Sequence, residues 1–134
     1  MAYLIDTDWV IDYLADVTEA ADLLSELAED GIAISIITYM EVYEGVGRSA
    51  NPEAAEETLA AFLTDVPIVS FSLAVARRCA TLRDTLRRQG KRVNARALDL
   101  IVAATALEAN LTLVTRNVDD YRDIHDLSLH QATP

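Results

Sequence analysis

Acidic residues recur along this chain where a fold of strands and helices could bring them to one place. They are Asp6, Glu41, Asp99, Asp119 and Asp120. Carboxylates that crowd together repel one another and raise each other's pKa values, so such a cluster is unfavourable unless a cation occupies it. Oxygen ligands without cysteine or histidine favour Mg²⁺, with Mn²⁺ as a substitute, over Zn²⁺. Such an ion can activate water and stabilise the charge that develops on a phosphodiester under attack.

Local sequence offers a simpler role for two of these acids. Asp6 follows the apolar stretch Tyr3–Ile5 directly before helical spacing begins, so it could cap that helix. Thr38, followed three residues later by Glu41, has the form of a capping box, in which Glu41 reaches back to the start of its own helix. The residue pattern alone leaves these capping roles open beside the metal-binding role.

Short apolar strands that alternate with helices must position the acids. Strands are predicted at residues 3–5, 32–34, 67–69 and 111–114, with a possible fifth at 127–129. Helices are predicted directly after Asp6 to about Leu14, over 18–29, from about Thr38 to the glycines at 45 and 47, and over 53–63, 72–89 and 98–109, with residues 91–97 as a linker.

This alternation predicts an α/β fold with a mainly parallel central sheet of four to five short strands, flanked by helices on both faces. Asp6 closes the first predicted strand, Asp99 opens the helix before the fourth, and the Asp119–Asp120 pair follows that fourth strand. Because the carboxyl ends of parallel strands meet at one edge of the sheet, we expect these acids to converge there.

Length and composition narrow the class of protein. A chain of 134 residues, 51% apolar and 25% charged, is expected to fold as one domain over residues 1–134. No apolar run approaches the roughly 18–20 residues that cross a bilayer, and the first residues lack the basic segment of a secretion signal. We therefore expect a cytoplasmic protein with no membrane partner. The single cysteine, Cys79, is expected to be a packed thiol on a helix.

The net charge of −11 argues against a nucleic-acid partner until its distribution is considered. Residues 1–70 hold fifteen acids and one base, whereas residues 71–134 hold seven acids and ten bases. Eight of the eleven basic residues lie between Arg77 and Arg96. Such a basic strip can bind a phosphate backbone, although it could equally be a solvated helix face that balances the acidic half.

Four segments together resemble the motifs of a known family. Leu4–Asp8 followed by Val10–Leu14 resembles its opening motif, and the later motifs are matched by Thr38–Gly45, Asp99–Ala106 and Leu113–Tyr121. Each segment alone is weak evidence for the family, but all four occur in the family's order and spacing over nearly the whole chain. The sequence is similar to the PIN-domain ribonucleases and, within them, to the VapC toxins of type II toxin–antitoxin modules. This resemblance implies that the predicted domain is PIN-like.

The resemblance also implies which acids are catalytic. The core catalytic and metal-binding acids would be Asp6, Glu41 and Asp99. The fourth would be Asp120, which precedes an aromatic residue as in the family, although the adjacent Asp119 could substitute.

Other polar residues are implied to support these acids. Thr7, Thr115 and Asn117 would hold the carboxylates in place or position water. Asp8 departs from the family pattern, where Asn or Ser is usual. We expect Asp8 to face solvent, with a contribution to a second metal site as the alternative.

The implied function is a metal-dependent endoribonuclease that acts as the toxin of a toxin–antitoxin module. A metal-activated water would attack phosphorus in a tRNA, rRNA or mRNA and leave 5′-phosphate and 3′-hydroxyl ends. The implied partners are a second copy of the chain and a VapB-like antitoxin, whose C-terminal segment lies in an apolar groove near the site, with helices around residues 9–28 and 39–62 as plausible walls. The candidate RNA-binding residues are Arg87, Arg88, Lys91, Arg92, Arg96 and Arg116.

Two other functions fit part of the pattern. Asp6-Thr7-Asp8 has the form of the nucleophile motif of haloacid dehalogenase-like phosphatases, with Asp6 as nucleophile and Asp8 as acid–base, but this leaves Glu41 and Asp99 unexplained. A non-enzymatic receiver-like signalling module also gathers acids at strand ends. It needs a lysine after a late strand, where this chain has Arg116.

Overall fold

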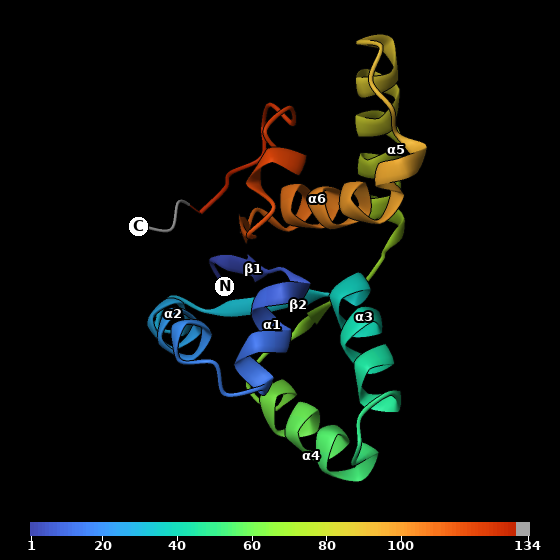
Figure 1. Ribbon diagram of the computed structural model, residues 1–134. Coiled ribbons are helices and arrows are strands. Elements are labelled where there is room, and N and C mark those ends of the chain that lie inside the picture. Colours follow the sequence, from blue (N-terminus) through green and yellow to red (C-terminus); the bar gives the residue numbers. More distant parts are fainter. Residues whose placement is uncertain (131–134) are drawn as a thin grey trace.

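The computed structural model describes residues 1–130, in which four parallel strands form one sheet in the order β3-β2-β1-β4 (Figure 1). The strands are β1 (Tyr3–Ile5), β2 (Ile32–Ser35), β3 (Ile68–Val69) and β4 (Thr112–Val114). β1 pairs with β2 on one side and β4 on the other, so Asp6 follows a central strand. The expected single α/β domain is confirmed over the described residues; the last four of the predicted span 1–134 lie outside them.

The central strands are apolar because both of their faces are covered. Leu4 and Leu113 point into one buried cluster, whereas the next residues, Ile5 and Val114, point into the other. Alternate residues of a strand face opposite sides of the sheet, so a sheet buried on both sides shows nearly continuous apolar runs. Two-sided burial holds β1 in the centre of the sheet, and Asp6 follows the last residue of this strand.

Helices cover the two faces unequally (Figure 1). On one face lie α1 (Thr7–Leu14), α2 (Thr18–Ala28), α3 (Ile36–Gly47) and α4 (Pro52–Leu63). On the other lie α5 (Leu73–Arg88) and α6 (Ala97–Ala109), which pack closely on each other. Two short 3₁₀ turns, η1 (Asn94–Arg96) and η2 (Val118–Asp120), precede α6 and follow β4.

Gly31 sets the approach of the chain to β2. Its φ is +93°, and a Cβ atom there would lie 2.9 Å from Cα of Met1. The backbone N–H groups of Ala2 and Tyr3 both donate to its carbonyl oxygen. Only glycine combines this backbone conformation with so close an approach.

Several expected boundaries differ in the structure. α3 begins at Ile36 rather than near Thr38, because Ser35 caps it by accepting a hydrogen bond from the Thr38 N–H. The same helix continues through Gly45 to Gly47. The predicted linker at 91–97 contains η1, and residues 127–129 form only an isolated bridge from Leu129 to Leu113.

Two further expectations can be compared with the described residues. Cys79 is buried on α5, as predicted, and burial raises the pKa of its thiol. Within residues 1–130 no helix is long and apolar enough to cross a membrane.

Candidate functional site

Asp6 lies at the carboxyl end of β1 and is held by two contacts. Its Oδ1 accepts a hydrogen bond from the Thr7 N–H at 2.9 Å, which caps α1. Its Oδ2 accepts from Oγ1 of Thr115, just beyond β4, at 2.7 Å. The local capping role is therefore real, but the second contact joins residues 109 positions apart. Asp6 is fixed in orientation by two neighbouring strands rather than by its own helix alone.

Glu41 contacts α1 instead of the start of its own helix. Its Oε1 accepts a hydrogen bond from Oγ1 of Thr7 at 2.6 Å. The Thr7 hydroxyl also lies 3.1 Å from Oγ1 of Thr38, which is fully buried. The capping-box interpretation is thus wrong, since Thr38 is inside α3 and Ser35 is the cap. Thr7 joins the element that carries Asp6 to the element that carries Glu41.

Asp99 lies in the first turn of α6 and faces the segment after β4. The hydroxyl of Tyr121, a residue only 1% exposed, donates to Oδ1 of Asp99 at 3.3 Å. Asp120 precedes Tyr121 on η2, and its negative charge helps to raise the pKa of Asp99. Asp120 therefore acts electrostatically on Asp99.

The carboxylates influence one another although they come from distant parts of the chain. Burial is the main cause that raises the pKa of Asp6, and the charges of Asp99 and Asp8 raise it further. Burial is also the main cause of the raised pKa of Asp99. Burial and the surrounding carboxylates raise the pKa of the Tyr121 hydroxyl as well, so it remains a donor. A cation at this edge of the sheet would relieve the repulsion.

The residues present match the chemistry of a hard divalent cation. Their donors are carboxylate oxygens, which Mg²⁺ and Mn²⁺ prefer, and burial together with the charges of Asp99 and Asp8 already opposes the ionised form of Asp6. As the side chains stand, no three acidic, histidine or cysteine residues within residues 1–130 are grouped closely enough to hold an ion. The residues that would hold it are Asp6, Glu41, Asp99 and Asp120.

The remaining predicted polar residues differ in how they are placed. Thr115 is buried, and its Oγ1 accepts from the Asn117 N–H as well as donating to Asp6. Asp8 is exposed on α1, as expected. Asp119 is exposed and forms an ion pair with Arg122 at 3.1 Å. The charge of Asp120, and not that of Asp119, is among the causes that raise the pKa of Asp99, and Asp120 stays the predicted fourth acid.

Several predicted RNA-binding side chains have partners within the protein. Arg116 forms an ion pair with Asp12, and its guanidinium carbon lies 4.0 Å from the centre of the Trp9 ring. Arg88 pairs with Asp84 on the exposed face of α5.

Lys91 and Arg96 share one carboxylate, that of Asp123. Sequence reasoning missed Asp123, Asp12 and the hydroxyl of Thr38. Their partners lie far away in the chain, so no local pattern could have identified them.

The chain is similar in sequence to one known protein family and to several of its members. Residues 3–126 match the family described as PIN domain. Ribonuclease VapC2 of Rickettsia felis is 34% identical over 98 residues, which are 73% of this chain and 72% of the relative. Ribonuclease VapC1 of Haemophilus influenzae strain R2866 is 28% identical over 135 residues, 99% of each chain. A Shigella flexneri protein named tRNA(fMet)-specific endonuclease VapC is 24% identical over 127 residues, 95% of each.

A solved structure has the same fold along nearly its whole length. The crystal structure of VapBC2 from Rickettsia felis, bound to a DNA fragment from their promoter, superposes with a TM-score of 0.84. The aligned chains are 30% identical, and the match covers 97% of this chain and 98% of the other.

Proposed function

Because this chain belongs to the PIN-domain family and, within it, to the VapC ribonucleases, we propose that it is a metal-dependent endoribonuclease that acts as the toxin of a toxin–antitoxin module. The observation that carries the proposal is the set of contacts and charge effects that connects Asp6 with Glu41 and Asp99. Asp6 and Glu41 are linked through Thr7, and Asp99 acts on the pKa of Asp6. The names of the relatives describe ribonucleases, which agrees with this chemistry.

The acids would hold Mg²⁺, with Mn²⁺ as a substitute, and the neighbouring hydroxyls keep them oriented. When bound, such an ion lowers the pKa of water and stabilises negative charge on a phosphodiester. The Thr115 hydroxyl donates to Asp6 and the Thr7 hydroxyl donates to Glu41, so both hydrogen bonds favour ionised carboxylates. The hydroxyl of Tyr121 does the same for Asp99.

The phosphatase and receiver-like alternatives lose their support with the family assignment. Asp8, which would be the acid–base residue of a phosphatase, is exposed on α1. Glu41 and Asp99, which a phosphatase leaves without a role, belong to the same group of acids as Asp6. Neither alternative is retained.

Cleavage of RNA by the purified chain should require a divalent metal. We expect cleavage in Mg²⁺, none in EDTA, and recovery in Mn²⁺, with 5′-phosphate and 3′-hydroxyl ends on the mapped products. Glu41→Gln should reduce the rate by about 100-fold, since it removes the charge that faces Thr7. Glu44→Gln, an exposed change on the same helix, is the matched control. Undiminished cleavage in EDTA, or by Glu41→Gln, would contradict the proposed site.

Basic residues in the second half of the chain are proposed to bind the RNA backbone. Arg116 directly follows Thr115, and Arg87, Arg88 and Arg92 are exposed along α5 and the segment after it. Their positive charge lies in an otherwise acidic chain, so binding should weaken steeply as salt concentration rises. RNA is cytoplasmic, and we place the activity there. A homodimer, which the family resemblance implied, remains part of the proposal.

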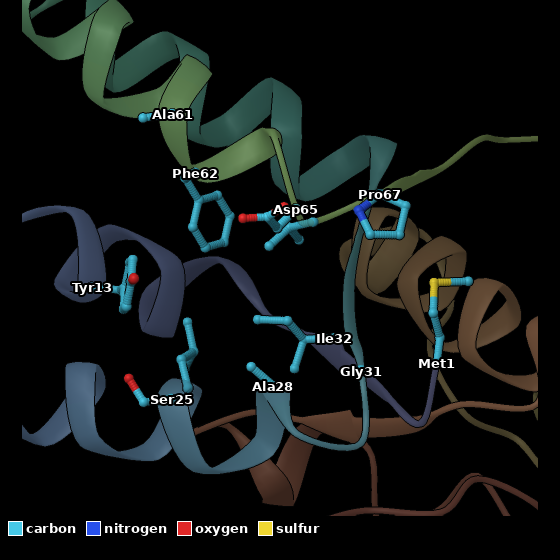
Figure 2. A pocket seen from close by; sticks show the side chains of 12 residues that line it. Met1, Tyr13, Ser25, Ala28, Gly31, Ile32, Ala61, Phe62, Asp65 and Pro67 are labelled. Atoms are coloured by element: carbon cyan, nitrogen blue, oxygen red, sulfur yellow. The ribbon is translucent and has the colours of Figure 1, made fainter.

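A hollow between α1, α2 and α4 is the proposed binding site for the antitoxin. Tyr13 and Phe62 line it, with ring centres 5.3 Å apart, and Ala61 and Ser25 lie on its two sides (Figure 2). Its deeper part, about 360 Å³, reaches Ile32 at the start of β2. The hollow thus extends to the amino ends of the strands, opposite to the end that carries Asp6, whereas the family resemblance implied a groove near the acids. An apolar segment of an antitoxin, the kind of partner seen with similar VapC chains, would bury its side chains there.

Filling this hollow should weaken antitoxin binding without affecting catalysis. Ala61→Arg places a long side chain on the exposed lining of the hollow and should weaken binding of the antitoxin encoded beside this chain by tenfold or more, about 1.4 kcal/mol. Ala60→Arg, the adjacent exposed position outside the lining, is the matched control. Affinity is measured by titration calorimetry, and RNA cleavage by the free toxin should be equal in both variants. Equal antitoxin affinity in both would place the groove elsewhere.

A further inference from the structure

The two segments that carry Asp99 and Asp120 are tied together by one guanidinium group. Arg96 ends η1 three residues before Asp99, and its side chain is only 20% exposed. Its Nη1 and Nη2 donate to the two carboxylate oxygens of Asp123, each at 2.8 Å. A two-pronged contact of this kind fixes the plane of the guanidinium as well as its position.

The same guanidinium also contacts the backbone beside the fourth acid. Nη2 of Arg96 donates to the carbonyl oxygen of Asp120 at 2.6 Å. Arg96 therefore contacts both Asp120 and Asp123, which lie three positions apart on the segment after β4. Because a carbonyl oxygen is a fixed point of the backbone, this bond restrains where the side chain of Asp120 begins.

The charges around Asp123 strengthen this link. The hydrogen bonds from Arg96 hold the pKa of the Asp123 carboxyl below its usual range, and Lys91 contributes a further contact at 3.3 Å. The pKa of Arg96 is raised in return, chiefly by its bonds to Asp123. Three of the five N–H donors of Arg96 are thus used within the protein, and its side chain is only 20% exposed, which disfavours contact with an RNA phosphate.

We propose that Arg96, anchored on Asp123, is a positioning residue that sets Asp120 beside Asp99, and that it does not contact RNA. The inference rests on the proposed function, since it concerns the acids assigned there to the metal. It also separates Arg96 from the exposed basic residues of the strip, of which Arg92 is an example nearby in the sequence.

Separate measurements of metal affinity and RNA affinity distinguish a positioning role of Arg96 from an RNA-binding role. Mn²⁺ affinity is measured by titration calorimetry, and RNA affinity with a labelled, unfractionated tRNA pool in EDTA, where no cleavage occurs. Arg96→Ala should weaken Mn²⁺ binding by 10- to 100-fold and leave metal-free tRNA affinity within about twofold. Arg92→Ala, the matched control, should weaken tRNA binding, reduce its salt dependence, and leave Mn²⁺ affinity unchanged.

Two further variants test whether Arg96 acts through Asp123. Arg96→Lys keeps the charge but cannot form the two-pronged contact, so it should restore Mn²⁺ affinity only in part. Asp123→Asn should weaken Mn²⁺ binding as Arg96→Ala does, and the double variant should be no worse than either single one. Saturating Mg²⁺ should return kcat for RNA cleavage toward the wild-type value, which a collapsed site would not allow.

The outcomes separate this inference from the proposed function. Wild-type protein that neither binds Mn²⁺ nor cleaves RNA would contradict the proposed function. Wild-type Mn²⁺ binding with unchanged affinity in Arg96→Ala, or a loss of metal-free tRNA affinity equal to that of Arg92→Ala, would overturn the role of Arg96 alone. If circular dichroism shows that Arg96→Ala is unfolded, Arg96→Lys and Asp123→Asn decide by the same two affinities.

Discussion

Replacing Asp6 with asparagine is expected to reduce Mg²⁺-dependent RNA cleavage by roughly 10³-fold or more while leaving the chain folded. Asn caps helices about as well as Asp, so the cap of α1 on the Thr7 N–H should survive. The charge that the Thr115 hydroxyl orients would be lost. Cleavage of a labelled RNA and growth arrest after induction measure the effect. Asp22→Asn, an exposed change on α2, is the control and should remain fully active.

The pH dependence of stability shows whether Asp6→Asn has removed a strained charge. Burial, together with the charges of Asp99 and Asp8, raises the pKa of Asp6 in the folded chain. A carboxyl whose folded pKa is raised holds its proton more tightly when folded. Without metal, stability therefore falls as pH rises from about 4, the usual Asp pKa, through the raised value.

Asparagine carries no such charge. In EDTA at neutral pH, Asp6→Asn should therefore be at least as stable as the wild type, and its advantage should disappear below about pH 4. Urea unfolding at several pH values measures this difference. A variant that is less stable at neutral pH, or that cleaves RNA at the wild-type rate, would show that Asp6 is structural.

Truncating Tyr121 to alanine should destabilise the protein by about 3–5 kcal/mol. Its ring is 1% exposed and belongs to the cluster between the sheet and the α5–α6 pair, so the change leaves a cavity in the core. Thermal unfolding followed by circular dichroism should show a melting temperature lower by roughly 10 °C or more. The control variant Tyr43→Ala removes a ring that is 42% exposed, so it should lower the melting temperature far less.

Tyr121→Phe separates the packing role of this residue from its polar role. The ring remains, so the loss of stability should be about 1 kcal/mol or less, while the hydrogen bond to Oδ1 of Asp99 disappears. Mn²⁺ affinity and the cleavage rate should fall by about tenfold, because Asp99 loses the donor that orients it. Unchanged metal affinity in Tyr121→Phe, or a loss of less than about 1 kcal/mol in Tyr121→Ala, would contradict these assignments.

The order of strands and helices could be predicted from the sequence because its signals are local. Apolar runs at β1, β2 and β4, and Ser72 before α5, depend on neighbouring residues only. The recurrence of acids after these elements also indicated an edge where they would gather. The start of α3 was missed because Ser35 and Thr38 are both acceptable caps, and only the burial of Thr38 against Thr7 decides between them.

By itself, then, the sequence determined the parallel α/β architecture and predicted which acids belong to the site, since strand periodicity and residue type can be read from short stretches. The tertiary structure alone decided what those acids contact. Thr115 donates a hydrogen bond to Asp6, 109 positions away in the sequence, and Arg96 donates to Asp123, 27 positions away. Such pairs form only when separate elements pack on one sheet. The same packing gives Glu41 the Thr7 hydroxyl as its partner and places Arg96 against the backbone of Asp120.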